Sequence, residues 1–175
     1  GENVRRRGRT GVVSELVIRE IGADEFARVW PFFQAIAAGG ETYTYPRDIS
    51  LEQARSMWTT PPARCFVAER DGQALGCYRL APNQMGPGDH VANGSYMVAP
   101  QARRQGVASA LCEHSLEQAR RAGFRAMQFN AVVASNTTAV RLWQRHGFRI
   151  VGQVPGAFRH AQLGPTDLYV MHRML

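Results

Sequence analysis

An apolar strand that runs directly into a basic, glycine-containing turn and then into a helix is the feature that most constrains the fold of this chain. The segment reads Ser95-Tyr-Met-Val-Ala-Pro-Gln-Ala-Arg-Arg-Gln-Gly-Val-Ala-Ser109. A helix that begins here presents the unpaired backbone N–H groups of its first turn beside Arg103 and Arg104. Such groups bind anions, and phosphates in particular. The sequence therefore predicts a phosphate-binding turn between a strand and a helix.

The elements around this turn predict a mixed α/β (α+β) domain. The helix at 106–122 joins strands at 91–98 and 125–133, and a βαβ unit makes two such strands parallel. The other expected elements are a strand at 16–21, a helix from 23 to 39 kinked or shortened by Pro31, a helix at 51–58, strands at 65–70 and 73–80, a helix at 136–146, and strands at 148–154 and 167–174. The order βα(α)βββαβαβ indicates a central mixed, twisted sheet with helices on both faces.

The connections between these elements carry further signals. Asp71-Gly72 predicts a tight hairpin turn, and Gly94 favours a bulge in its strand. Two long loops are expected, at 41–48 and at 155–165. The first is rich in tyrosine and contains an acid, which is common in binding sites. The alternative is that its rings only pack over the edge of the core.

Length and composition predict one domain. The chain has 175 residues and a hydrophobic fraction of 45%, which is enough for a sizeable core. Residues 1–13 are polar and basic and are expected to be a flexible tail, so that 14–175 form the single domain. No apolar run approaches the roughly 18 residues that cross a bilayer, and no apolar stretch follows the charged N-terminus. We therefore expect a cytoplasmic protein without a membrane partner.

The charge pattern favours a polyanionic ligand over nucleic acid. The net charge is +7, and all 21 basic residues are arginine, which is typical of a GC-rich bacterial genome. Four arginines lie in the run 5–9; without them the net charge falls to +3. That run is interpreted as tail, with a nucleic-acid-binding arm as the alternative. The three cysteines form no CxxC pair, so we expect buried thiols and no metal site.

Two motifs resemble the GCN5-related N-acetyltransferase (GNAT) superfamily. Arg103-Arg-Gln-Gly-Val-Ala108 is similar to the family's pyrophosphate loop, Gln/Arg-x-x-Gly-x-Gly/Ala. The segment from Asn136 to Phe148 resembles the family's motif of an Asn, a helix and a closing Gly-Phe. The chain contains no lysine and hence no GxxxxGK[S/T] loop. The resemblance covers 15–175 and implies an enzyme, an N-acetyltransferase that takes its acetyl group from acetyl-CoA.

The resemblance also implies where acetyl-CoA binds. The parallel strands 91–98 and 125–133 are expected to splay apart, and the pantetheine arm to lie in the V between them. The Val98 N–H is then the candidate donor that polarises the thioester carbonyl. The implied cofactor-binding residues are Met97, Val98, Arg103, Arg104, Gln105, Gly106, Val107, Ala108, Ser109, Asn136 and Trp143.

Two proton-transfer residues found in many relatives are missing. Residues 91–98 contain no acid, and Trp143 replaces the tyrosine that would protonate the leaving thiolate. The candidates for the base are Asp89, His90, Glu41 and a water held by Asn93. The thiolate is protonated by water or leaves unprotonated, because an ordinary thiol pKa is about 8.5.

A narrower resemblance concerns the acceptor. Glu41-Thr-Tyr43, Asn93-Gly-Ser95, Met127-Gln-Phe-Asn130 and Pro155-Gly-Ala-Phe-Arg-His160 are similar to a subgroup that includes fungal enzymes acetylating L-azetidine-2-carboxylate. This implies catalytic roles for Asn93 and Asn130 beside Val98, and a substrate site of Glu41, Tyr43, Asn93, Asn130 and Phe158. The alternative for Asn93 and Asn130 is a structural hydrogen bond at the splay, and for Asn136 a helix cap.

The expected function is N-acetylation of a small-molecule amine such as an amino acid or imino acid. Acetylation of a protein or peptide is the first alternative, and a non-catalytic acetyl-CoA-binding module is the second. The loops at 41–48 and 155–165 favour the small molecule, because they are long enough to enclose it. A homodimer is possible.

Overall fold

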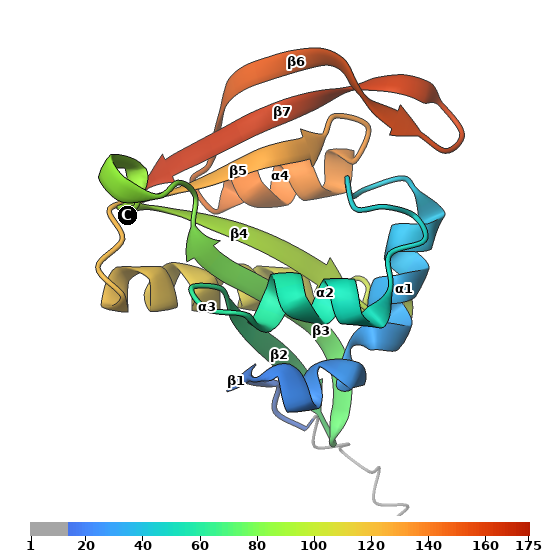
Figure 1. Ribbon diagram of the computed structural model, residues 1–175, viewed down its shortest axis with the longest axis vertical. Coiled ribbons are helices and arrows are strands. Elements are labelled where there is room, and N and C mark those ends of the chain that lie inside the picture. Colours follow the sequence, from blue (N-terminus) through green and yellow to red (C-terminus); the bar gives the residue numbers. More distant parts are fainter. Residues whose placement is uncertain (1–13) are drawn as a thin grey trace, which may run out of the picture.

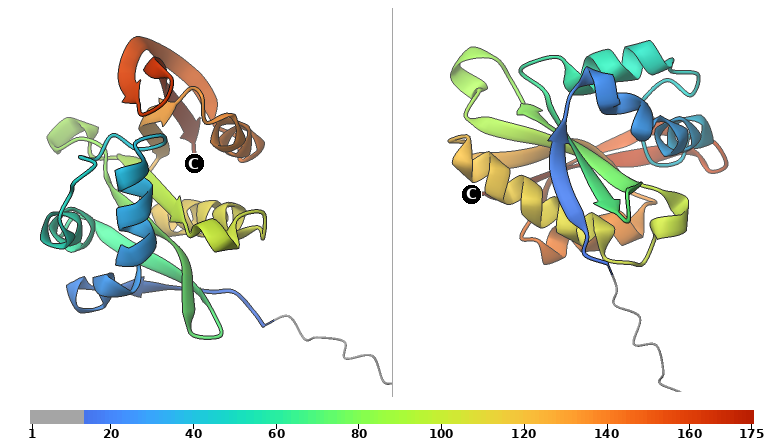
Figure 2. Two further views of the ribbon diagram at one scale, coloured as in Figure 1. Left: turned by 90° about the vertical axis from the view of Figure 1, so that its right-hand side faces the viewer. Right: turned by 90° about the horizontal axis from the view of Figure 1, so that it is seen from below.

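The computed structural model describes residues 14–175, so the predicted basic tail at 1–13, with its run of arginines, lies outside the described residues. A seven-stranded sheet forms the centre of this part of the chain (Figure 1). Its strands are β1 (Val17–Ile21), β2 (Arg64–Arg70), β3 (Gln73–Pro82), β4 (Val91–Val98), β5 (Ala126–Val133), β6 (Arg149–His160) and β7 (Gly164–Met174). Their order in the sheet is β1-β2-β3-β4-β5-β7-β6. The sheet is strongly twisted, so that β1 crosses the direction of β5 and β7 (Figure 2).

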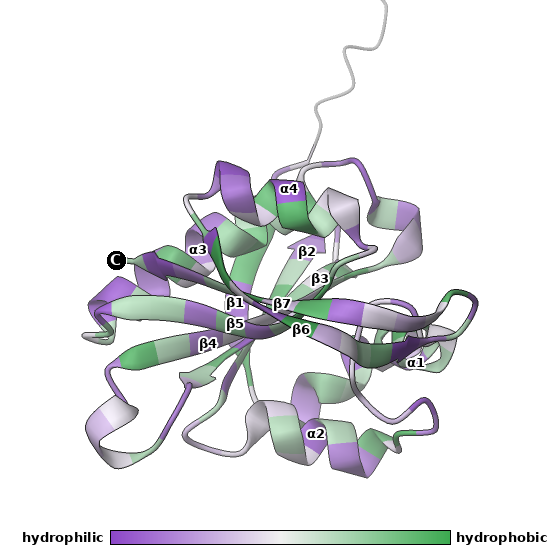
Figure 3. Ribbon diagram, turned by 90° about the horizontal axis from the view of Figure 1, so that it is seen from above, coloured by the Kyte–Doolittle hydropathy of each residue, from purple (hydrophilic) through white to green (hydrophobic). Residues whose placement is uncertain are grey.

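Helices cover both faces of the sheet, as predicted. The helices α1 (Trp30–Gly39) and α2 (Leu51–Thr59) lie on one face, and α3 (Val107–Arg121) and α4 (Thr137–Arg145) lie on the other (Figure 3). Short 3₁₀ turns are η1 (Ala23–Arg28), η2 (Gly86–Gly88) and η3 (Pro100–Ala102). The architecture is therefore the mixed α/β sandwich expected from the sequence.

The strands β4 and β5 are parallel and separate after a short paired stretch. Their register contains three pairs: Val91 with Ala126, Ala92 with Met127, and Asn93 with Gln128. Beyond Asn93, β4 continues to pair with β3 and β5 with β7. This confirms the predicted splay. The expected bulge at Gly94 is wrong for the β3–β4 ladder, whose register runs unbroken through this residue.

The core has an apolar layer on each face of the sheet. Under α1 and α2, Phe33 packs edge-on against Trp58 and Phe26. On the opposite face, the Tyr96 ring lies between β3 and α4. The three cysteines are buried within the core, in line with the prediction, and burial raises the pKa of Cys65 and of Cys112 to about 12.

The first predicted helix is divided into two elements. A 3₁₀ turn, η1, ends at Arg28, and α1 begins at Trp30. Of the two predicted effects of Pro31 the structure shows the shorter helix and not the kink, because Pro31 lies in the first turn of α1. There its missing N–H breaks no helical hydrogen bond.

The prediction of a loop at 155–165 is wrong for most of these residues, which belong to strands. β6 extends to His160, β7 begins at Gly164, and the two strands pair across Phe158–Thr166 and His160–Gly164. The ladder is irregular between Val154 and Phe158. A proline is tolerated there because β6 is the edge strand and its outer groups have no ladder partner. Long-range pairing with β7 therefore overrides the local Pro/Gly signal.

The Asp71-Gly72 hairpin is confirmed, with φ of 53° and 75° at its two residues. Positive φ at both positions is what a type I′ turn requires.

Within residues 14–175 no helix has the length and apolar content needed to cross a membrane. The same described residues contain no group of three His, Cys, Asp or Glu side chains placed to hold a metal ion.

Candidate active site

The phosphate turn has the backbone conformation that an anion site needs. Arg104 and Gly106 adopt φ of 63° and 77°, and Gly106 is the N-cap of α3. Among residues 14–175 no side chain caps this helix, and its first turn contains no acid. The N–H groups of that turn are therefore free for a ligand. Arg103 and Arg104 are exposed beside them, so the donor set fits the pyrophosphate implied by the motif.

The other residues of the turn have different roles. Val107 is buried and anchors α3 in the core. The Gln105 side chain accepts from Arg70 Nη1 at 3.2 Å and donates to the Gln101 carbonyl at 3.2 Å. These bonds use one of the two N–H donors and one acceptor site of the exposed amide, and its contact with the cofactor stays a prediction. Ala108 and Ser109 are half-buried in the first turn.

Successive peptide groups of β4 point alternately toward β3 and toward the gap between β4 and β5. The Ala99 N–H donates to the Leu75 carbonyl on the β3 side at 2.8 Å. Because peptide groups alternate along a strand, Met97 also faces β3, whereas Val98 and Tyr96 face the gap. The predicted role of Val98 agrees with this geometry. That of Met97 does not, because its backbone is turned to β3 and its side chain is 1% exposed.

A cavity of about 240 Å³ lies where β4 and β5 separate. It is bounded by the two strands, by the loop after α1, and by the first turns of α4. The lining residues come from these four segments and are Thr42, Tyr43, Thr44, Tyr45, Asn93, Gly94, Ser95, Tyr96, Phe129, Asn130, Ala131, Val132, Val133, Asn136, Ala139 and Trp143. Half of these lining residues are aromatic or carry an amide, and among the described residues no Asp, Glu, His or Arg lines the wall.

Asn93 lies at the point where the strands part. Its Nδ2 donates to the Gln128 carbonyl oxygen at 3.0 Å. This bond gives a β5 carbonyl a partner at the last residue pair of the parallel ladder, and so stabilises the point at which the two strands separate. Within the described chain no group donates to Asn93 Oδ1, which leaves one acceptor at the cavity wall. The structural interpretation of Asn93 is therefore correct, and its free oxygen is compatible with a role in the site as well.

Asn130 belongs to a chain of amides that sequence reasoning missed. Its Oδ1 accepts from Gln128 Nε2 at 2.9 Å, and its Nδ2 donates to Asn83 Oδ1 at 2.8 Å. These bonds fix the orientation of the Asn130 amide at the cavity edge. Gln128 and Asn130 alternate along an otherwise apolar strand, which is the signal that could have paired them. Asn83 is far away in sequence and gave no such signal.

The aromatic loop lies at the cavity and also packs against the core. Tyr43 lines the cavity and stacks on Tyr45, with ring centroids 5.7 Å apart. The Tyr45 hydroxyl accepts from the buried Trp58 Nε1 at 3.1 Å, which ties the loop to α2. Burial raises the pKa of Tyr43 and of Tyr45. Both hydroxyls therefore stay protonated near neutral pH.

Trp143 and Asn136 lie where α4 meets the cavity. The Trp143 ring is 8% exposed and lies 4.8 Å from Tyr96 and 4.9 Å from Phe129. The Asn136 side chain accepts from the Ala139 N–H at 3.4 Å, so it caps α4 as the alternative interpretation had it. The Tyr96 hydroxyl lies 2.5 Å from Ser115 Oγ on α3. It is therefore turned away from the cavity and does not replace the tyrosine that α4 lacks.

Four candidates for the base or the acceptor site do not reach the cavity wall, and neither does Val98. Glu41 is exposed and absent from the lining, although Thr42 and Tyr43 are part of it. Phe158 is buried in a separate small cluster with Val133 and Leu168. Asp89 and His90 precede β4 at the end where β4 and β5 are joined, since the Arg125 N–H donates to the His90 carbonyl. The splay opens at the other end, so neither lies beside it.

Comparisons with known proteins identify the class. The sequence signature of the Acetyltransferase (GNAT) family matches residues 27–148. The chain therefore belongs to the GNAT family of acetyl-CoA-dependent acetyltransferases.

Individual relatives agree with this assignment. The chain is 49% identical to a GCN5-related N-acetyltransferase from Kribbella flavida, with a TM-score of 0.87, covering 91% of this chain and 98% of that one. It is 35% identical to N-acetyltransferase aca1 of Schizosaccharomyces pombe over 64% of this chain, and spans 55% of the length of that relative. YncA, a putative acetyltransferase from Salmonella typhimurium solved with acetyl-CoA, has a TM-score of 0.80 at 19% identity, covering 91% of this chain and 94% of that one. At that identity the likeness concerns the fold alone.

Proposed function

We propose that this chain transfers an acetyl group from acetyl-CoA to the amine of a small molecule, an amino acid or an imino acid. The observation that carries the proposal is the small cavity at the splay, which lies on the same strand as the phosphate turn. Membership of the GNAT family identifies acetyl-CoA as the acetyl donor. The turn at Arg103–Ala108 fits this donor, because it has the free N–H groups and the charge that a pyrophosphate needs. The acceptor is inferred from the cavity.

The size and wall of the cavity favour a small acceptor. Its volume of about 240 Å³ is below the roughly 300–1,000 Å³ typical of sites for drug-sized ligands. The loop 42–45 and the two strands bound the cavity on different sides, and it is open to solvent on the rest. A peptide substrate would favour an open groove. The amides of Asn93 and Asn130 at its edge can bind a polar acceptor without carrying charge themselves.

The chain's own groups supply positioning and polarisation. Bound acetyl-CoA supplies the thioester that the amine attacks. The backbone N–H of Val98 faces the gap and is the proposed donor to the carbonyl oxygen, where negative charge develops. Asn93 lies five residues before Val98 on β4, roughly 16 Å along an extended strand, so its Oδ1 is proposed to accept from the acceptor molecule away from the reacting nitrogen.

The proton of the amine has no acidic residue to receive it in the cavity wall. Glu41 remains a candidate base only if the loop moves, and Asp89 and His90 lie at the joined end of the strands. Water in the gap between β4 and β5 is therefore the proposed route for the proton. Trp143 donates no proton to the thiolate, because an indole N–H is a donor of hydrogen bonds but not a useful acid.

The finer proposal is an imino acid acceptor such as L-azetidine-2-carboxylate. It is supported by the resemblance of the segments around Tyr43, Asn93 and Asn130, of which all three residues line the cavity. The test is release of free CoA thiol from acetyl-CoA with a panel of amines: imino acids, proteinogenic amino acids, phosphinothricin and short peptides. Turnover with imino acids or amino acids, and none with peptides, is the expected result. Turnover confined to peptides would overturn the proposal.

The non-catalytic alternative is separated by the same panel. A protein that binds acetyl-CoA in calorimetry but releases no thiol with any acceptor would be a binding module. The cytoplasmic location, bacterial source and homodimer expected from the sequence remain predictions. Size-exclusion chromatography with light scattering measures the oligomeric state.

A further inference from the structure

A contact between Ser109 and His146 joins two helices at the phosphate turn. Ser109 Oγ lies 2.8 Å from His146 Nε2. Ser109 is the third residue of α3, and His146 is the residue at which α4 ends. Both side chains are half-buried. The contact thus determines the orientation of a hydroxyl in the turn whose free N–H groups fit the pyrophosphate.

The position of His146 is fixed independently of α3. Its carbonyl oxygen accepts from Arg173 Nη1 on β7 at 2.7 Å. The next residue, Gly147, has φ of 87°, and a Cβ there would lie 3.1 Å from the same Nη1. The glycine therefore leaves room for the arginine. As a result the histidine is held by the sheet and presents its ring to the serine.

The histidine changes what the serine hydroxyl can do. Serine hydroxyls within a helix commonly bond back to a carbonyl three or four residues earlier, which uses up their hydrogen. A neutral imidazole that carries its hydrogen on Nε2 donates one bond and remains uncharged. If that hydrogen points to Ser109 Oγ, the oxygen acts as acceptor and its own O–H is free for an anion.

We propose that His146 is a positioning residue for the binding of CoA: its Nε2–H holds Ser109 Oγ so that the serine O–H donates to a pyrophosphate oxygen. The proposal rests on the proposed function, since it takes CoA as the ligand of the turn. It gives a role at the phosphate turn to a residue of the second motif, which is separate in sequence from the turn itself. It also explains why a histidine lies at the end of a helix that faces the first turn of α3.

Binding of CoA measured by titration calorimetry tests the proposal without any acceptor. Ser109→Ala and His146→Ala are each expected to weaken CoA binding about tenfold, as for loss of one hydrogen bond to a charged group. The double variant is expected to bind about as weakly as either single variant, because both remove the same bond. His146→Gln, whose amide can donate from a similar position, is expected to bind within about threefold of the wild type.

His114→Ala is the matched control. His114 Nδ1 lies 2.7 Å from the Tyr78 hydroxyl and so also ties α3 to a neighbouring element, but about two turns from the start of the helix. This variant is expected to lower the melting temperature and leave the affinity for CoA unchanged. A His146 that acted only in stability would behave in the same way, and that result would overturn the proposal.

Long-range ¹H–¹⁵N spectra of the wild type provide a test that needs no variant. The Nε2 of His146 is expected to carry the hydrogen both before and after addition of CoA. A bare Nε2 would make the serine the donor to histidine and would overturn the proposal. Wild-type protein that binds no CoA would overturn the proposed function as well. Wild-type binding together with equal binding by His146→Ala would overturn this inference alone.

Discussion

At the residue scale, Asn93 combines a structural bond with a free acceptor. Its Nδ2 is used by the Gln128 carbonyl, and its Oδ1 is left at the cavity wall. An amide suits this position because it can donate on one side and accept on the other. A carboxylate of the same shape would place an oxygen against the Gln128 carbonyl oxygen.

Replacement of Asn93 tests its role in acceptor binding. We expect Asn93→Ala to lower kcat/KM for the amine by about 10- to 100-fold, the range for loss of a hydrogen bond in the reacting complex. The affinity for CoA should change far less, since the phosphate turn follows the other end of β4. Steady-state kinetics and calorimetry measure the two effects. Gln153→Ala removes an amide outside the cavity and is the control; an unchanged kcat/KM in Asn93→Ala would contradict the prediction.

Gly76 marks a close approach of β3 to β4 and α3. A Cβ at this position would lie 2.9 Å from the Met97 carbonyl oxygen, 3.0 Å from Val107 Cγ1 and 3.1 Å from a Leu111 methyl. The nearest of these atoms belongs to backbone that is held in the sheet. The glycine is therefore needed for packing, without any positive φ.

Gly76→Ala should consequently destabilise the fold. The expected loss is about 1–3 kcal/mol in the free energy of unfolding, as for an extra methyl in a packed core. Urea denaturation measures it. Gly39→Ala is the control, because no atom lies within 4 Å of a Cβ there, and it should be neutral or stabilising by up to about 1 kcal/mol. Equal stabilities of the two variants would show that β3 can move away.

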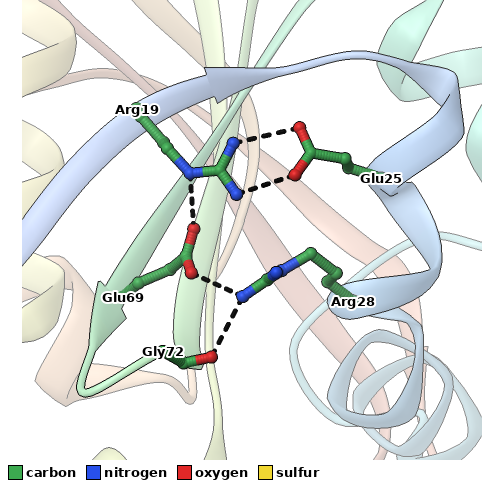
Figure 4. Close-up of polar contacts among 5 residues, drawn as sticks. All are labelled: Arg19, Glu25, Arg28, Glu69 and Gly72. Carbon is green, nitrogen blue, oxygen red and sulfur yellow. Dashed lines mark hydrogen bonds and ion pairs between the residues drawn. The ribbon is translucent and has the colours of Figure 1, made fainter.

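At the scale of elements, four charged side chains hold η1 to the edge of the sheet (Figure 4). Arg19 on β1 makes a two-bond contact with Glu25 of η1, at 2.7 and 3.0 Å. Glu69 on β2 accepts from both Arg19 and Arg28, and Arg28 also donates to the Gly72 carbonyl. The Arg19 hydrogen bonds lower the pKa of Glu25. The network compensates for the short, weakly bonded 3₁₀ turn.

Of the four side chains in this network, Glu69 is expected to contribute most to the stability of the fold. Its side chain is 12% exposed and lies between two arginines. We expect Glu69→Gln to cost about 1–2 kcal/mol in the free energy of unfolding, with a smaller difference at high salt. Glu117→Gln breaks an exposed pair with Arg121 and should cost about 0.5 kcal/mol or less. Denaturation at two salt concentrations makes the comparison, and equal costs would contradict it.

At the scale of the whole molecule, stability should depend on pH through the packing of α3 on the sheet. Burial, together with the charges of Arg121 and Arg64, lowers the pKa of His114 from its ordinary value of 6.5. The folded state therefore binds the His114 proton less readily than the unfolded state. The contribution of the neutral His114 ring to stability is therefore complete above about pH 6.5. It is lost as the pH falls toward the pKa of His114 in the folded state.

His114→Asn should remove this part of the pH dependence. The asparagine amide can keep a bond to the Tyr78 hydroxyl but does not titrate. Denaturation of wild type and variant between about pH 8 and pH 5 gives the difference in unfolding free energy, and other histidines cancel in it. The wild type is expected to lose more stability than the variant on acidification. Parallel curves would mean that His114 is charged or accessible in the fold.

Much of the molecule follows from short stretches of sequence. The strand–turn–helix at the phosphate site, the Asp71-Gly72 hairpin and the cap at Asn136 each depend on neighbours within a few residues. Backbone conformation and capping act over that range, so these features were predictable. The extent of β6 and β7 was not, because their pairing joins residues that a Pro/Gly-rich segment separates.

By itself, the sequence determined the order of the elements, the family and the phosphate turn, since each is encoded locally. Only the tertiary structure decided what surrounds the gap between β4 and β5. Tyr43 lines the cavity and Glu41, two residues away, does not; Phe158 turns to a separate cluster; and Asn83 reaches Asn130 across the sheet. The physical reason is that a loop side chain takes its direction from contacts with distant elements, and no local pattern records those contacts.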